Sequence, residues 1–172
     1  MRQPNLGDLT LETNNAPKVA ALVGDGYTIA SLSIANSTIL ALEPEFTDSE
    51  AREAISQAEG LNSYYLAIGV GDLRLPAITD LSIAASLITI LIAQGYDIET
   101  LASRSMVDTL DNISGIALIS ANDIVNQAIA IWAFYQGELP EEPAPPPRPA
   151  TPIRPASVQV LGIYTRMNWT WS

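Results

Sequence analysis

Apolar residues recur with helical spacing over most of residues 17–139. The clearest helix start is Thr47, because its hydroxyl can accept from the amide of Glu50 while the Glu50 carboxylate reaches back to the Thr47 amide. The pattern predicts a helix from there to about Glu59, ended by Gly60, and a second short helix over residues 61–68.

The most apolar predicted helix follows Pro76 and ends at Gly95. Thr79 or Asp80 is its expected cap. Leucine and isoleucine occupy both faces of residues 81–92, and a helix that is apolar all round is normally buried. We therefore expect this helix in the core or at a subunit contact.

Three further starts are expected in the second half of the body. Asp97 is expected to cap the next helix, and Asn112 or Ser114 to open another segment. Residues 120–123 resemble a cap, so residues 116–119 are expected to be separate from a last helix that Gly137 closes.

The N-terminal part of the chain has a weaker pattern. Residues 1–16 are polar and predict an arm or loop, and Pro17 suits the first turn of a short helix. Gly24 and Gly26 break that helix. Residues 27–42 allow either a small hairpin or a helix, since their Ser, Thr and Ile favour one and their Ala and Leu the other.

The predicted fold class is mainly α. We expect an N-terminal arm over 1–16 and a compact helical body over 17–139, with a possible small hairpin near its start. A proline-rich linker over 140–156 and a C-terminal docking strand over 157–172 complete the chain.

The linker is defined by proline. Residues 140–155 hold eight of the twelve prolines, which exclude both a helix and a central strand. The segment should be extended polyproline II, and at about 3.1 Å per residue it would reach roughly 50 Å.

The last residues have the cleanest strand pattern in the chain. Apolar and polar residues alternate from Ser157 onward, and the one glycine there, Gly162, is expected to mark a bulge. Such a strand needs a partner for its backbone and its apolar face. Strand addition to a neighbour is the preferred interpretation; a strand in the chain's own sheet and a frayed end are the alternatives. The candidate partner-binding residues are Arg148, Arg154, Val158, Val160, Ile163, Met167, Trp169 and Trp171.

Charge separates the body from the tail. Residues 1–139 hold 17 acids and 5 bases, a net charge of −12, whereas residues 140–172 hold 2 acids and 3 bases, a net charge of +1. An acidic body disfavours contact with nucleic acid and with an anionic membrane surface. The N-terminus has no apolar signal-peptide core, and no apolar run is long enough to span a membrane.

The residues available for chemistry are few. The chain has no His and no Cys, so the usual general base, the thiolate nucleophile and the commonest zinc ligands are missing. Asp108 and Asp111 could share a helix face and hold Mg²⁺, but the preferred interpretation is a helix that ends there, with Asp111 or Asn112 capping the next segment. We expect no enzyme activity, no cofactor and no metal.

A compact body, a proline-stiffened arm and a terminal strand ending in residues 168–172 form a layout that resembles the small structural proteins of tailed-phage virions, such as head–tail adaptors or capsid cement proteins. The resemblance implies a non-enzymatic subunit that joins copies of itself and other structural proteins in a virion assembled in the host cytoplasm. Capsid decoration is the alternative place in such a virion. A different function, a scaffold whose Pro-x-x-Pro segment with Arg148 and Arg154 recruits a partner domain, is also compatible with the sequence.

Overall fold

The computed structural model describes residues 2–13, 15–69 and 73–139. Helices are the regular elements of these residues, which confirms the mainly α prediction for the body. The proline-rich linker and the docking strand lie outside the described residues. The hairpin considered for residues 27–42 is wrong, because this stretch forms α2 (Ile29–Leu32) and α3 (Ser37–Leu40). Local caps decide the outcome, since Thr28 accepts from the Ser31 amide at 3.1 Å and Asn36 accepts from the Thr38 amide at 2.9 Å.

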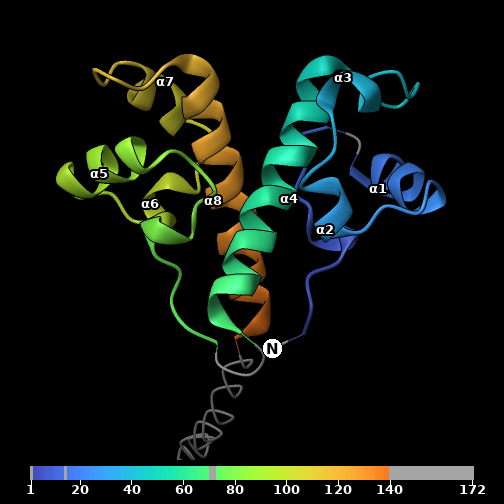
Figure 1. Cartoon of the computed structure of the whole chain (residues 1–172), viewed down its shortest axis with the longest axis horizontal. Coiled ribbons are helices and arrows are strands. Elements are labelled where there is room, and N and C mark those ends of the chain that lie inside the picture. Colours follow the sequence, from blue (N-terminus) through green and yellow to red (C-terminus); the bar gives the residue numbers. More distant parts are fainter. Residues whose placement is uncertain (1, 14, 70–72, 140–172) are drawn as a thin grey trace, which may run out of the picture. The chain divides into compact units, whose positions relative to one another are not determined.

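Two long helices, α4 (Asp48–Ile68) and α8 (Leu118–Glu138), pack together at the centre of the body (Figure 1). The capping box at the start of α4 is confirmed, with the Thr47 amide donating to Glu50 at 2.9 Å. The predicted end at Gly60 is wrong, since α4 continues to Ile68 as one helix. A Cβ at Gly60 would lie 2.8 Å from the Cβ of Gln127, so the glycine permits the close approach of α8.

The expected starts before α8 are also corrected. Helix α8 begins at Leu118 and runs through residues 120–123 without a break, and the Asn122 side chain donates back to the Leu118 carbonyl at 2.8 Å. Asn112 does not open a segment, because it is the C-terminal cap of α7 (Met106–Asp111). Ser114 lies in the connection between the two helices.

The order of elements occurs twice. The first repeat, residues 2–69, contains η1 (Leu6–Asp8), α1 (Asn15–Gly24), α2, α3 and α4; the second, residues 73–139, contains η2 (Ile78–Asp80), α5 (Ala85–Ala93), α6 (Ile98–Leu101), α7 and α8. The two long helices have 21 residues each and start 70 positions apart. Gly26-Tyr27 and Gly95-Tyr96 follow α1 and α5 at the same place, with glycine φ values of 77° and 78°. The body is therefore an internal duplication.

A buried glutamine holds the same backbone position in each repeat. The Gln57 side chain accepts from the Thr10 amide at 2.7 Å and donates to the Thr10 carbonyl at 3.1 Å. Its counterpart Gln127 accepts from the Ser82 amide at 2.7 Å and donates to the Ser82 carbonyl at 3.3 Å. Both glutamines are fully buried, so each long helix is clamped to the segment that begins its own repeat.

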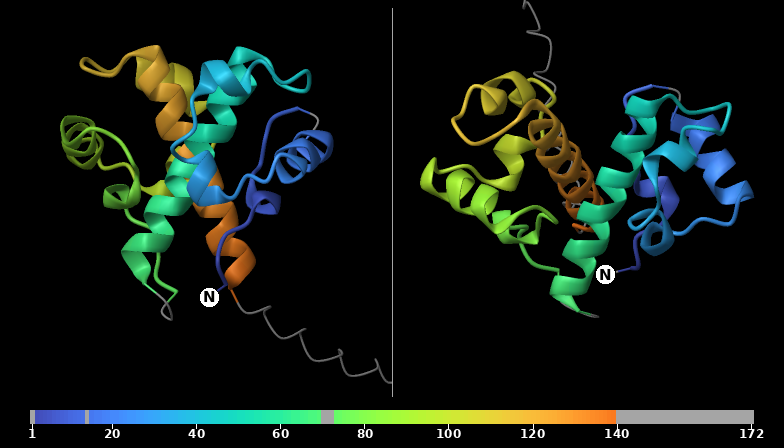
Figure 2. Two further views of the ribbon diagram at one scale, coloured as in Figure 1. Left: turned by 45° about the vertical axis from the view of Figure 1, so that its right-hand side comes forward. Right: turned by 45° about the horizontal axis from the view of Figure 1, so that its top comes forward.

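The segments that begin the repeats also reach across to the opposite half. The Arg2 guanidinium lies 5.1 Å from the ring of Phe134 on α8, and the Arg74 guanidinium lies 5.9 Å from the ring of Tyr64 on α4. Burial raises the pKa of Tyr64 to about 12, so its hydroxyl stays protonated and donates to the Arg74 carbonyl. Such reciprocal contacts are those of an approximate twofold axis between α4 and α8, and the views in Figure 2 show the short helices of each repeat on opposite sides of this pair.

The core includes residues that the sequence pattern assigned to an arm. Leu6, Leu9 and Leu11 are buried, so residues 2–13 pack into the body instead of extending from it. The chain divides into two units, Met1–Pro140 and Glu141–Ser172.

The most apolar helix is shorter and more exposed than predicted. Helix α5 begins at Ala85, and Asp80 does not cap it, because the Asp80 carboxylate accepts from the Ala77 amide at 2.7 Å within η2. Leu91 is its one buried residue, whereas Ile92 is 55% exposed. The expected place in the core is therefore wrong, because α5 is a surface helix with an incompletely covered face, whereas the alternative of a subunit contact stays a prediction.

Candidate functional site

The partner-binding residues predicted from the sequence all belong to residues 140–172 and lie outside the described residues. They are Arg148, Arg154, Val158, Val160, Ile163, Met167, Trp169 and Trp171. A candidate site in the body must therefore be built from other side chains.

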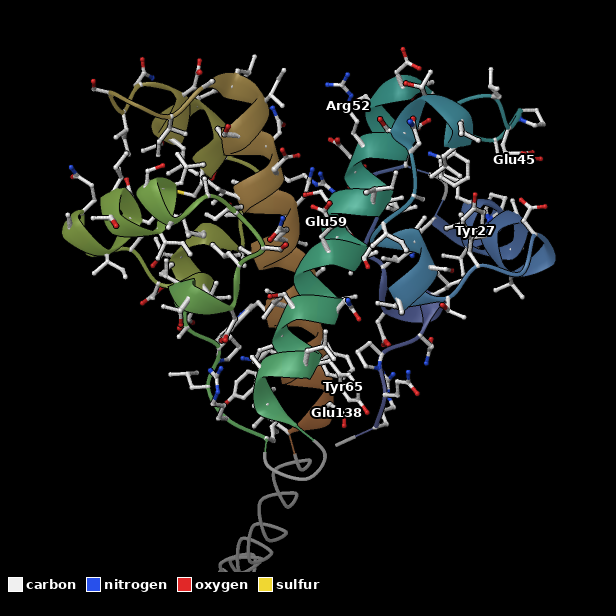
Figure 3. All side chains as sticks on the ribbon, in the orientation of Figure 1. Tyr27, Glu45, Arg52, Glu59, Tyr65 and Glu138 are labelled. Atoms are coloured by element: carbon white, nitrogen blue, oxygen red, sulfur yellow. The ribbon has the colours of Figure 1, made fainter. Side chains whose placement is uncertain are left out.

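A groove of about 410 Å³ lies between the N-terminal segment, the α1–α2 connection and the second half of α4. We call it the tyrosine groove because Tyr27 and Tyr65 both line it, and Figure 3 shows these two residues on the same side of α4. Its lining residues are Gln3, Pro4, Asn5, Leu6, Gly7, Val23, Tyr27, Thr28, Ile29, Ala30, Asn62 and Tyr65.

Local sequence signals fix each wall of the tyrosine groove. Asn5 caps the turn that holds the N-terminal wall, accepting from the Gly7 amide at 2.8 Å. Gly26 adopts a positive φ of 77°, which turns the chain so that Tyr27 follows directly after α1. Val23, at the end of α1, is 61% exposed and adds an apolar edge. The groove thus combines aromatic, aliphatic and amide surfaces, a mixture typical of sites for apolar or aromatic groups.

The corresponding place in the second repeat contains an extra aromatic ring. Residues 62 and 65 of α4 correspond to Trp132 and Tyr135 of α8 at the 70-residue spacing. Trp132 packs against the core, and its ring stacks on that of Tyr135 with centroids 5.5 Å apart. In the first repeat, Asn62 stands where that indole would be.

Comparison of the chain with protein-family models, with curated proteins and with solved structures found no match. Function must therefore be inferred from the geometry of the molecule itself.

A second concave region, the carboxylate groove, lies between α4 and α8 and is lined by Arg52, Ser56, Glu59 and Asp123. Figure 3 shows Glu59 on the side of α4 that faces α8. Burial raises the pKa of Asp123, and burial together with the charge of Asp123 raises the pKa of Glu59. The nearby Arg52 charge partly opposes the shift at Asp123.

The carboxylate groove is poorly equipped for chemistry. The Ser56 hydroxyl donates to the Asp123 backbone carbonyl at 3.1 Å, so it serves to join the two helices. Within the described ranges, no group of three or more acidic residues is placed to hold a metal ion. Two partly desolvated carboxylates in this position exchange protons with solvent and weaken the contact between the repeats when both are charged.

The two acidic residues considered as a Mg²⁺ site, Asp108 and Asp111, lie on α7, where the backbone of Asp108 takes part in ending the helix. Asp108 and Asp111 are both exposed, and the Asn112 side chain donates to the Asp108 carbonyl at 2.6 Å at the end of the helix. The helix therefore ends here as expected, but the expected cap of a following segment is wrong, because Asn112 is the C-terminal cap of α7 and Ala117 precedes α8.

Most basic side chains of the body are already paired with acids. Arg2 pairs with Glu138 at 3.0 Å, Arg74 donates to Asp80 at 2.8 Å, and Lys18 and Arg104 form ion pairs with other acids. Because acids outnumber bases in the body, the unpaired surface charge is negative. No helix within the described residues combines the length and apolar character needed to cross a membrane.

Sequence reasoning missed the tyrosine groove. Its walls come from three segments that are separated in the chain, and no local sequence pattern predicts such a site. The repeated Gly-Tyr pair and the 70-residue spacing of Gln57 and Gln127 were the available signals, because aligning the two halves would have set Asn62 against Trp132.

Proposed function

We propose that this protein is a non-enzymatic structural subunit of an oligomeric assembly, of the kind found at the head–tail junction of tailed-phage virions, and that its C-terminal segment links neighbouring copies. The observation that carries the proposal is the division of the chain at Pro140. The described residues of the duplicated body bury a core of their own, and we propose that another copy completes the apolar alternation of residues 157–172.

The surface of the body supports an assembly role. Several large apolar side chains are well exposed, among them Ile34 at 85%, Leu42 at 80% and Leu66 at 70%. The incompletely covered face of α5 adds to them. Apolar side chains that one copy leaves exposed are available to be buried against a neighbouring copy.

Charge supports the same role. A net charge of −12 over residues 1–139 and of +1 over residues 140–172 favours contact between the tail of one copy and the body of another. The same negative charge disfavours binding to a phosphate backbone.

The test is a double substitution, Trp169→Ala with Trp171→Ala, in the full chain. Truncating two aromatic anchors should abolish assembly, measured as molar mass by light scattering, while the helical circular-dichroism signal stays unchanged. The matched control is Trp132→Phe, which keeps an aromatic ring on α8 and should leave assembly intact. A collapse of the helical signal in the double variant would instead place the strand in the body's own core and refute the proposal.

A further inference from the structure

We infer that the tyrosine groove binds an indole, that of Trp169 or Trp171, from the C-terminal segment of a second copy of this chain. The inference rests on the proposed function and adds the surface that receives the segment.

The first argument is a comparison within the molecule. At the position of Asn62, the second repeat carries Trp132, whose ring stacks on Tyr135. The residue that corresponds to Tyr135 is Tyr65, a wall of the tyrosine groove. The second repeat therefore shows that an indole fits against the tyrosine at this position, and the first repeat has no such ring beside Tyr65.

The second argument concerns the walls, which the two repeats share in part. Pro4 corresponds to Pro76, Tyr27 to Tyr96 and Ile29 to Ile98, so the change from Trp132 to Asn62 occurs within a partly shared frame. An asparagine there removes the large ring and leaves an amide that can bond to an indole N–H or to the backbone of an entering segment.

The third argument identifies the source of the indole. The chain has three tryptophans, and the two besides Trp132 are Trp169 and Trp171. They belong to the part of the chain with net positive charge. Asp25, exposed beside the turn that precedes Tyr27, adds negative charge near the groove.

The geometry of the exit from α8 favours a second copy over the same chain. The Arg2 amide donates to the Glu138 carboxylate at 3.0 Å, so α8 ends beside the segment that supplies Gln3 and Pro4 to the groove. The proline-rich residues 140–156, extended at about 3.1 Å per residue, would carry the tryptophans roughly 50 Å away. A spacer of that length reaches a neighbour and is far longer than a return to the adjacent groove requires.

The main variant is Asn62→Trp in the full chain, which gives the first repeat the ring that the second already has and fills the groove. Asn62→Gln is the matched control, because it keeps the amide and leaves the groove open. Light scattering over a concentration series should show association at least about tenfold weaker for Asn62→Trp and unchanged for Asn62→Gln. Wild-type association by a folded Asn62→Trp protein would overturn the inference.

A second measurement does not depend on how Asn62→Trp folds. A photo-crosslinking amino acid replaces Trp171 in chains mixed with isotopically labelled wild-type chains, and the crosslinked peptides are mapped. Crosslinks between labelled and unlabelled chains at Tyr27 or Tyr65 support the inference. Crosslinks between chains that map elsewhere, for example to α5, overturn it while leaving the proposed function standing. Crosslinks within one chain only, with a monomeric wild-type protein, overturn both.

Discussion

The two buried glutamines provide the sharpest test of the internal duplication. Gln57→Met and Gln127→Met keep an unbranched side chain of similar length but remove the amide that binds the backbone of Thr10 or Ser82. Gln127→Met leaves the N–H and the C=O of Ser82 without their side-chain partner, whereas Gln57→Met leaves the N–H of Thr10 without one and its C=O with the Arg104 donor at 3.2 Å.

The expected cost follows from those two groups. A buried polar group that loses its partner costs about 1–3 kcal/mol, and the lower half of that range applies here because Thr10 and Ser82 are partly open to solvent. Each substitution should therefore lower the free energy of unfolding by about 2–4 kcal/mol. The two losses should be similar, because Thr10 is the less exposed backbone partner but its carbonyl keeps the hydrogen bond from Arg104.

Urea unfolding followed by circular dichroism measures both losses. Gln136→Met is the control, because Gln136 is exposed on the same helix as Gln127 and should change stability by less than about 0.5 kcal/mol. If one glutamine variant is destabilised and the other is neutral, the two clamps are not equivalent and the repeat interpretation of the fold is refuted.

Two further predictions concern the contact between the long helices. Gly60→Ala should destabilise the body by about 1–2 kcal/mol in urea unfolding, despite the higher helix propensity of alanine, because the new Cβ would lie 2.8 Å from that of Gln127. Gly137→Ala is the control, because the space around its Cβ is open, and it should stabilise the body by about 0.5–1 kcal/mol. Equal effects of the two substitutions would contradict the packing described at Gly60. Glu59→Gln should stabilise the body at pH 7, because burial and Asp123 raise the pKa of Glu59 and so penalise its charged form in the folded state. That advantage should shrink as the pH falls and disappear below the ordinary pKa of 4.5, where the carboxyl is protonated in both states. The exposed Glu45→Gln should show no such trend. A Glu59→Gln protein whose stability relative to wild type is lower at pH 7 than below pH 4.5 would contradict this prediction.

Local signals predicted local structure well. The capping box at Thr47 and the cap at Asp97 are both present, the latter accepting from the Thr100 amide at 2.7 Å. These motifs depend on residues within one turn of each other, so the sequence contains all the information they need.

Signals that depend on distant residues were misread. Gly60 looked like a helix end, but the partner that requires a glycine there is Gln127, on a helix formed much later in the chain. The apolar pattern of α5 also predicted a place in the core or at a subunit contact, since it contains no information about the elements that pack against the helix. Its surroundings, not its own pattern, decide how much of it is covered, and in the body only Leu91 is buried.

The candidate site was the hardest part to predict. Several lining positions of the tyrosine groove differ between the two repeats, Asn62 against Trp132 among them, and the repeats share too few identical residues for the period to be obvious in the sequence. Once the fold pairs Gln57 with Gln127, the remaining correspondences follow, and the contrast between Asn62 and Trp132 becomes the informative feature of the molecule.

The central claim is that residues 140–172 join separate copies of a body that is complete without them. The most direct measurement is the molar mass in solution, by light scattering, of the full chain and of a chain ending at Pro140. The full chain is expected to form a defined oligomer and the shortened chain a folded monomer with the same helical signal per body. Equal masses for the two proteins, or an unfolded shortened chain, would contradict the claim.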